Sequence, residues 1–300
     1  MKPPFSYYGG KQRLASKILP LIPKHTVYVE PFAGSAAVMF NKPWPEVSNS
    51  DHYREVLNDL NLDIYGFYKC LQDKEKAKKL LHRLEFTLYS IKEHEISKQK
   101  TDDEIEKVAR FFVNISMSFS NVANSGWATG VYSRNLAATW AKRVERLKDY
   151  LTRMQSVHIE CINALDCIVK WDSPQTFFYC DPPYVGTNQG HYSGYTDIDL
   201  AMLVNTLHKC QGSFLLSSYD HKIINSKNWE RFEFKAHCSS SCKGKTAGHD
   251  KTKKAVDIGE RERTEIIWRR LNRVPVREEI QRLYDSGKYD CFKGDNDFLK

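Results

Sequence analysis

The chain has 300 residues, of which 41% are hydrophobic, and this is enough to bury the core of one α/β domain with an insertion. No apolar run is long enough to cross a membrane and the N-terminus has no secretory leader, which excludes membrane and secreted classes and predicts a soluble, cytoplasmic protein. The eight cysteines lack a paired framework, as in a chain with reduced thiols, and the net charge of +8 matters chiefly through the places where basic residues cluster.

Residues 26–38 read as a strand, a tight turn of small residues and the start of a helix. Gly34 lets a ligand approach the backbone closely, and the N–H groups that open the helix point toward that ligand. A second strand over residues 54–58 is followed by Asp59, and an acidic residue at this distance from a glycine-containing turn is typical of a unit that holds ribose hydroxyls. Because the turn has one glycine, a nucleoside cofactor without a pyrophosphate is favoured.

From residue 64 to residue 153 the pattern is helical and charged. Helices are expected at 74–97, 102–118 and 136–153. The third helix is amphipathic and carries Lys142 on its basic face, which is either a DNA contact or simply solvated.

Residues 119–135, between the second and third of these helices, are dense in Asn, Ser, Gly and aromatic residues and are expected to form a loop or hairpin. Their amides and hydroxyls could reach base edges, and Trp127 or Tyr132 could wedge against a base step. The alternative is an ordinary surface loop around a buried tryptophan.

Residues 176–180 form a short run of β-branched and aromatic residues, which is typical of a buried parallel strand. Asp181-Pro182-Pro183-Tyr184 follows, and its two prolines fix φ and remove two backbone donors, so the turn is stiff and its carbonyls are unpaired. Ligands of open α/β sheets bind beyond the carboxyl ends of strands, so this turn predicts a site for a flat polar molecule. The alternative is a turn that only caps the strand.

Two more strands are expected at 232–236 and 264–268, joined by a lysine-rich loop that either contacts phosphates or is solvated. Four side chains near this loop could be drawn as zinc ligands: His237, Cys238, Cys242 and His249. One Cys-x3-Cys pair without a second pair is weak spacing, so no metal site is predicted. Residues 275–286 read as an amphipathic helix before a polar tail.

Four motifs stand in a fixed order along the chain: Tyr7-Tyr8-Gly9-Gly10-Lys11, Glu30-Pro31-Phe32-Ala33-Gly34, Asn58-Asp59 and Asp181-Pro182-Pro183-Tyr184. Together they resemble the Dam-like group of DNA adenine-N6 methyltransferases, over roughly residues 1–270. The resemblance implies S-adenosylmethionine as cofactor and double-stranded DNA as partner. It also implies an α/β fold, a Rossmann-like methyltransferase sheet flanked by helices, with a mostly helical target-recognition insertion.

The resemblance further implies a division of the chain into domains. The catalytic domain would comprise 1–64 and 156–272, the insertion 65–155, and a C-terminal helix and tail 273–300. A protein of this kind would be encoded by a prokaryote or phage and associated with the nucleoid.

Candidate site residues are carried over from the family by position. The catalytic motif would consist of Asp181, Pro182, Pro183 and Tyr184, with Asp181 between the cofactor and the target base. Contacts to the cofactor would come from Tyr7, Lys11, Glu30, Pro31, Phe32, Ala33, Gly34, Ser35, Asp59, Asn163 and Asp181. Contacts to DNA would come from Asn124, Trp127, Tyr132, Arg134, Lys142, Lys243, Lys245, Lys253 and Lys254.

Two positions depart from the family pattern. Ala36 stands where many members have a second glycine, and because alanine is small the expected effect is a slightly tighter turn. Asn163 stands where the family commonly places an aspartate near the adenine ring of the cofactor. Its amide can accept a hydrogen bond but carries no charge, which bears on cofactor affinity.

The proposed chemistry does not require Asp181 to be a strong base. The exocyclic amine of adenine is a poor nucleophile because its lone pair is delocalised, and methyl transfer places positive charge on that nitrogen. The Asp181 carboxylate and the Pro182 carbonyl can each accept one N–H and so stabilise that charge. A carboxylate with an ordinary pKa of about 3.9 is too weak to ionise the neutral amine. The base must leave the duplex, and Tyr184 is expected to stack on it.

Two other functions remain open on the sequence alone. The same fold could methylate another planar amine, on cytosine N4, RNA or a protein amide. A non-catalytic DNA-binding relative could have lost its cofactor site at Asn163, and binding of S-adenosylmethionine would separate it from an enzyme.

Overall fold

The computed structural model describes residues 1–7, 9–44, 53–130, 135–186, 194–237 and 262–272. Within them lies a seven-stranded sheet with the order β3-β2-β1-β4-β5-β7-β6. The strands are β1 Val27–Glu30, β2 Arg54–Asn58, β3 Val157–Glu160, β4 Thr176–Cys180, β5 Ser213–Ser218, β6 Glu230–His237 and β7 Glu262–Arg270. The expected α/β sheet is confirmed, and all five strands that the sequence predicts are present.

The first five strands of the sheet order pair in parallel, and β7 runs antiparallel to both β5 and β6. From β1 the chain steps outward through β2 to β3, and it then returns to place β4 on the other side of β1. The order therefore reverses between β1 and β4. In open α/β sheets a ligand binds at such a reversal, beyond the carboxyl ends of the strands.

Strand β4 is buried on both faces, as its unbroken apolar sequence predicts. Phe177 and Tyr179 pack into one core cluster, and Phe178 and Cys180 pack into the other. Successive side chains of a strand point to opposite faces, so an apolar residue at every position requires helices on both sides.

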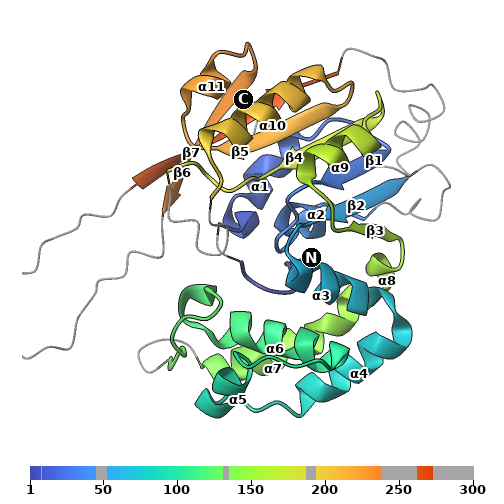
Figure 1. The fold of residues 1–300 in the computed structure, drawn as a ribbon, viewed down its shortest axis with the longest axis vertical. Helices are drawn as coiled ribbons and strands as arrows, with labels where there is room; N and C mark the ends of the chain where they lie inside the picture. The colour runs from blue at the N-terminus through green and yellow to red at the C-terminus, as the bar shows by residue number, and fades with distance from the viewer. Residues whose placement is uncertain (8, 45–52, 131–134, 187–193, 238–261, 273–300) are drawn as a thin grey trace, which may run out of the picture.

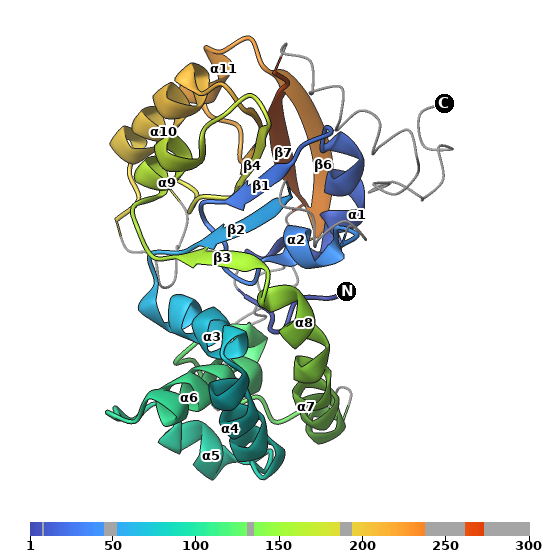
Figure 2. The same cartoon turned by 90° about the vertical axis from the view of Figure 1, so that its right-hand side faces the viewer.

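Helices cover both faces of the sheet (Figures 1 and 2). One face is covered by α1 Ala15–Ile18, α2 Ala37–Asn41 and α3 Leu62–Gln72, whose buried residues share the cluster that contains Phe177. The other is covered by α9 Ala164–Trp171, α10 Asp197–Lys209 and α11 Lys222–Asn225, which share the cluster of Phe178.

The helical insertion lies below the sheet in Figure 1. It contains α4 Lys74–Glu85, α5 Ile91–Ile96, α6 Glu104–Met117, α7 Leu136–Glu145, the 3-10 segment η5 Arg146–Tyr150 and α8 Leu151–Met154. Phe67 of α3 stacks on Phe112 of α6 with ring centroids 5.5 Å apart, and both belong to the cluster that contains Phe177. The insertion and the sheet thus share one core, and the domain boundaries stay a prediction.

A buried ion-pair cluster fastens the end of the insertion to the sheet. Arg153 of α8 donates to both carboxylate oxygens of Glu55 on β2, at 2.8 and 2.6 Å, and Lys42 lies 3.1 Å from the same carboxylate. Burial raises the pKa of Glu55, but the two cations outweigh it and hold the pKa at about 2. A buried carboxylate is tolerated because it is paired in this way.

One predicted helix is wrong: residues 74–97 form two helices. α4 ends at Glu85, and Ser90 caps the start of α5 by accepting a hydrogen bond from the Glu93 N–H at 3.2 Å. The helix expected at 136–153 contains a 3-10 segment between α7 and α8, whereas that expected at 102–118 is confirmed as α6. Residues 275–286 lie outside the described residues.

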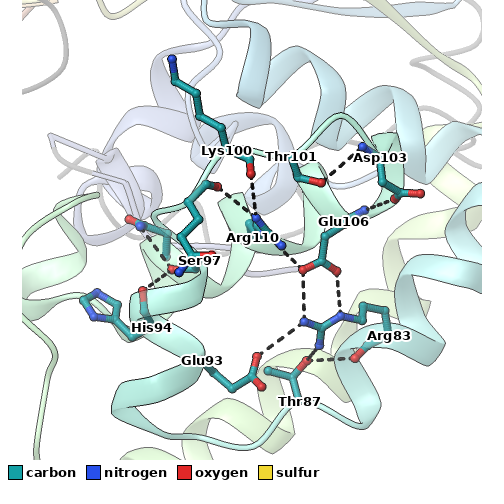
Figure 3. A network of polar contacts seen from close by, with 12 residues as sticks. Arg83, Thr87, Glu93, His94, Ser97, Lys100, Thr101, Asp103, Glu106 and Arg110 are labelled. Carbon is teal, nitrogen blue, oxygen red and sulfur yellow. Dashed lines mark hydrogen bonds and ion pairs between the residues drawn. The ribbon is translucent and has the colours of Figure 1, made fainter.

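A polar network holds the broken segment in place (Figure 3). Glu106 of α6 accepts hydrogen bonds from Arg83 of α4 at 2.8 Å and from Arg110 at 2.8 Å, and Arg83 lies 3.5 Å from Glu93 of α5. Arg110 also donates to two backbone carbonyls in the connection between α5 and α6. Arg83 thereby ties α4 to both α5 and α6.

The turn before α2 places Ala36 in the left-handed region, at φ 50° and ψ 41°. The expectation of a merely tighter turn is therefore incomplete, because an L-residue with a Cβ is strained in this conformation by about 1–2 kcal/mol. The residue is fully buried, so the surrounding core enforces the conformation.

Ala36→Gly should raise the free energy of unfolding by roughly 0.5–1 kcal/mol, because glycine adopts this φ freely and the gain exceeds its larger unfolded-state entropy. Urea denaturation followed by circular dichroism measures it. The matched control, Ala37→Gly at the first helical residue, should destabilise. A loss of stability in Ala36→Gly would show that the left-handed geometry costs nothing here.

Candidate active site

The candidate site lies where the strand order reverses. The turn 31–35 leaves the carboxyl end of β1, Asp59 follows β2, and the motif 181–184 follows β4. Three motifs that are far apart in sequence are therefore brought to one edge of the sheet, as the sequence predicts for parallel strands.

Asn58, the last residue of β2, links the ends of strands β1, β2 and β3. Its side-chain amide donates to the carbonyls of Pro31 and Ile162, at 2.9 and 3.0 Å, and its side-chain oxygen accepts the N–H of Ile162 at 3.0 Å. It is 1% exposed. Its buried hydrogen bonds fix the turn after β1 against the segment after β3.

Asp59 closes the turn after β1. Its carboxylate accepts the N–H of Gly34 at 2.8 Å and the N–H of Asn61 at 2.9 Å. Gly34 itself has φ 50°, and a Cβ there would come within 3.5 Å of the Tyr7 ring, so Tyr7 lies against the turn. Burial raises the pKa of Asp59 to about 6, although the two N–H groups oppose the rise.

Glu30, at the end of β1, is a buried carboxyl group. It accepts hydrogen bonds from the Tyr28 hydroxyl and the Met39 N–H, both at 2.8 Å. Burial raises its pKa to about 8, against the effect of these two donors. Glu30 therefore carries its proton at neutral pH.

The remaining residues of the turn after β1 lie where the sequence places them. Pro31, Ala33 and Ser35 are buried and Phe32 is half-buried. Their role toward a cofactor stays a prediction.

Lys11 and Asp181 form the central ion pair of the site. The Lys11 ammonium donates to the two Asp181 oxygens at 2.7 and 2.9 Å and to the Gly9 carbonyl at 2.9 Å. Gly9 has φ 76°, which glycine adopts without strain. This backbone conformation lets the chain turn so that the Lys11 side chain reaches the Gly9 carbonyl. Burial lowers the pKa of Lys11, but Asp181 and Glu265 overcome this and raise it.

Burial raises the pKa of Asp181, and Lys11 opposes the rise. Oxygen Oδ1 accepts from Lys11 and lies 3.1 Å from the Tyr184 hydroxyl, whose single proton is donated either to Oδ1 or to Glu265. Among the contacts of the described residues, Oδ2 accepts from Lys11 alone. Oδ2 is thus the oxygen with more capacity for an incoming donor.

The Tyr184 hydroxyl points into the protein. It contacts Ser217 of β5 at 2.7 Å and donates to Glu265 of β7. Its ring meets Tyr219 edge to face at 4.7 Å, and Lys11 lies 5.0 Å from its centroid. The ring is held in one orientation, and its stacking on a target base stays a prediction.

Sequence reasoning missed Glu265 and Ser217. The available signal was a carboxylate directly before the apolar run 266–268 of β7, where an unpaired charge would be costly. Its partner could not be read from the sequence, because β7 joins the sheet out of chain order, next to β5.

Asn163 caps helix α9. Its side-chain oxygen accepts the Leu165 N–H at 2.9 Å, and its side chain is exposed. The amide oxygen is thus partly engaged in capping, and the contact with a cofactor stays a prediction.

The candidate DNA contacts fall in two places, the insertion and the lysine-rich loop between β6 and β7. Trp127 is half-buried against Tyr89, at 5.8 Å between ring centroids, while the Asn124 side-chain oxygen accepts from Asn114 at 3.2 Å. Lys142 is exposed on α7. Six further candidates lie outside the described residues: Tyr132, Arg134, Lys243, Lys245, Lys253 and Lys254.

Within the described ranges, no helix combines the length and apolar character of a membrane span. Nor do three or more His, Cys, Asp or Glu side chains there converge as metal ligands. His237 ends β6, and Cys238, Cys242 and His249 lie outside the described residues.

Comparisons with known proteins agree with this arrangement. A family model for D12 class N6 adenine-specific DNA methyltransferase matches residues 7–253. The type II methyltransferase M.MjaIII of Methanocaldococcus jannaschii is 25% identical, with 81% of this chain and 94% of that protein covered. The retron Ec67 DNA adenine methylase of Escherichia coli is 24% identical, with 81% and 86% covered. The DNA N-6-adenine-methyltransferase of Escherichia phage P1 is 23% identical, with 82% of this chain but 34% of the phage protein covered.

The wild type should lose stability at alkaline pH as Glu30 ionises, and Glu30→Gln should not show this loss. The folded pKa of about 8 lies above the ordinary value of 4.5, so the contribution of this group is full below about pH 4.5 and is lost as the pH rises through 8. Glutamine mimics the protonated acid at every pH. The variant should match the wild type in melting temperature at pH 5 and exceed it at pH 8.5.

Thermal melts at both pH values measure this, with Glu75→Gln on the exposed face of α4 as control. An identical fall in melting temperature for Glu30→Gln and wild type would show that Glu30 titrates normally.

Proposed function

The chain belongs to the D12 class of N6 adenine-specific DNA methyltransferases, and on this premise we propose the part that each site residue takes. The protein transfers a methyl group from S-adenosylmethionine to N6 of adenine in DNA, as the resemblance implied. Cytosine, RNA and protein amides are thereby set aside as the main substrate. The observation that carries the proposal is the ion pair of Lys11 with Asp181 at the reversal of the sheet.

S-Adenosylmethionine fits the residues at the ends of β1 and β2. A carboxylate suits the two hydroxyls of a ribose. Among the described residues, Asp59 accepts two backbone N–H bonds of about four that it can take. Gly34 leaves the backbone of the turn open to close approach. The cofactor supplies an activated methyl group on a sulfonium; we assign Asp59 to its ribose, Tyr7 and residues 30–35 to its surroundings, and Asn163 to its adenine.

Asp181 and the Pro182 carbonyl receive the adenine amine. The buried carboxylate is held by Lys11 and the Tyr184 hydroxyl, so it is oriented before the base arrives. Fixed acceptors aimed at the amine hydrogens stabilise the positive charge that develops on the nitrogen, and they require no reorganisation. Tyr184, with its hydroxyl anchored, presents a ring for the extruded base.

The insertion is assigned to DNA recognition. Residues 117–119 and 126–128 pair as a short hairpin, through Phe119 N–H to the Gly126 carbonyl at 2.7 Å and Ala128 N–H to the Met117 carbonyl at 2.9 Å. Trp127 packs inward, whereas Phe119 is 54% exposed, so Phe119 is the better aromatic to contact a base step. The archaeal, bacterial and phage sources of the relatives suit a cytoplasmic enzyme acting on nucleoid DNA.

Asp181→Ala should lower the turnover number by about a thousandfold while DNA affinity stays within twofold, because the substitution removes the principal acceptor of the amine. Methylation of bulk DNA with labelled cofactor, digestion to nucleosides and counting of N6-methyladenine measures it. Asp102→Ala, at an exposed position of the insertion, is the control. Near-normal turnover would remove this carboxylate from the reaction.

Asp59→Asn should weaken S-adenosylmethionine binding roughly 10- to 100-fold, since an amide offers one acceptor where the carboxylate offers two and carries no charge. Calorimetric titration gives the dissociation constant. Asp63→Asn, on the exposed first turn of α3, should leave it unchanged. An unaltered dissociation constant in Asp59→Asn would refute the ribose assignment.

A further inference from the structure

Glu265 is a buried carboxylate that the proposed catalytic roles do not use. It lies on β7, which pairs with β5, and it is 6% exposed. It contacts Lys11, Ser217 and Tyr184. Burial of a carboxylate costs free energy, so we expect this side chain to have a role other than packing.

A single oxygen of Glu265 gathers three donors. Oε1 lies 3.3 Å from the Lys11 ammonium, accepts the Ser217 hydroxyl at 2.7 Å and accepts the Tyr184 hydroxyl. Lys11 also holds Asp181, and the Tyr184 hydroxyl, whose one proton is donated to Glu265 in this arrangement, lies 3.1 Å from Asp181 Oδ1. Glu265 therefore fixes the two residues through which Asp181 is oriented.

The charges of this cluster do not cancel. One ammonium, Lys11, stands between two carboxylates, Asp181 at 2.7 Å and Glu265 at 3.3 Å. Glu30, the other acidic group near Asp181, is protonated at neutral pH because its pKa is about 8. With Asp181 alone, Lys11 would face one acidic group, and Glu265 gives the cluster two acidic groups for one ammonium.

A negative cluster matches the charge that the reaction carries. The C–S bond of the sulfonium breaks as the C–N bond forms, so one positive charge moves from sulfur to the amine nitrogen and the sulfur becomes a neutral thioether. The nitrogen then returns to neutrality by releasing a proton to water. Substrate and transition state are cationic at this place, whereas the cofactor product is not.

We propose that Glu265 is a positioning residue whose charge makes the site favour the sulfonium S-adenosylmethionine over the thioether S-adenosylhomocysteine. The inference rests on the proposed roles of Lys11 and Asp181 at this site. It gives the second carboxylate two effects: it keeps Lys11 from neutralising Asp181, and it promotes release of the spent cofactor.

Glu265→Gln is the decisive variant, because glutamine retains an oxygen that can accept from Ser217 and Tyr184 but loses the charge. Calorimetry with each cofactor form should show the preference for S-adenosylmethionine over S-adenosylhomocysteine falling roughly tenfold, as expected for the loss of one charge in a poorly solvated cluster. Turnover should fall by a similar factor, with DNA affinity unchanged.

Three controls separate charge from structure. Glu265→Asp keeps the charge and should retain most of the preference, and Ser217→Ala removes a hydroxyl without a charge and should leave the ratio as in wild type. Glu233→Gln, on β6 with its side chain 55% exposed, should behave as wild type in every assay. If Glu265→Gln does not fold, Glu265→Ser tests the same loss of charge with room for water.

If Glu265→Gln binds both cofactor forms more weakly by the same factor, the ratio of their dissociation constants is unchanged. Glu265 then has only a structural role, and the inference is overturned. A loss of the ratio in Glu265→Asp equal to that in Glu265→Gln would do the same. Neither result touches the role of Asp181, because a wild type that methylates adenine and an inactive Asp181→Ala establish that role independently.

Discussion

The ion pair between Lys11 and Asp181 is the contact on which the rest of the site depends. It joins residues 170 positions apart, and it brings the N-terminal segment across the end of β4. Lys11 is buried and Asp181 is only partly exposed, so water competes weakly for the pair, and a broken pair would leave a poorly solvated charge. The fold supplies the geometry: β1 and β4 are neighbours with a reversal between them, and every motif of the site follows the carboxyl end of a strand or crosses it.

Much of this fold could be predicted from the sequence because a parallel sheet imposes a strong local signal. Residues 176–180 are apolar at every position since helices cover both faces, and no other element of that length has this requirement. Asp59 and Asp181 could be identified because they follow such strands directly. Family membership then confirmed the reaction, while the role of each residue stays a proposal.

The parts that sequence could not supply depend on contacts between distant segments. Glu265 is one of several charged residues in β7, and only the sheet order places it beside Ser217. The break at residues 86–90 follows from Ser90 capping α5 and from Glu106 binding Arg83 of a different helix. The size of Ala36 predicts only a tighter turn. Its strain comes from a left-handed backbone conformation, which the sequence does not disclose.

The core that runs from the sheet through Phe67 and Phe112 into the insertion limits how such an enzyme can acquire a new recognition sequence. Exchange of residues 65–155 for the insertion of a relative would cut this core and separate Arg153 from Glu55. The hairpin around residues 117–128, by contrast, is held by a few hydrogen bonds, from or to Asn114, Tyr89, His94 and Lys98. Sequence specificity can therefore drift by changes in the hairpin, while the helices beneath it stay bound to the catalytic sheet.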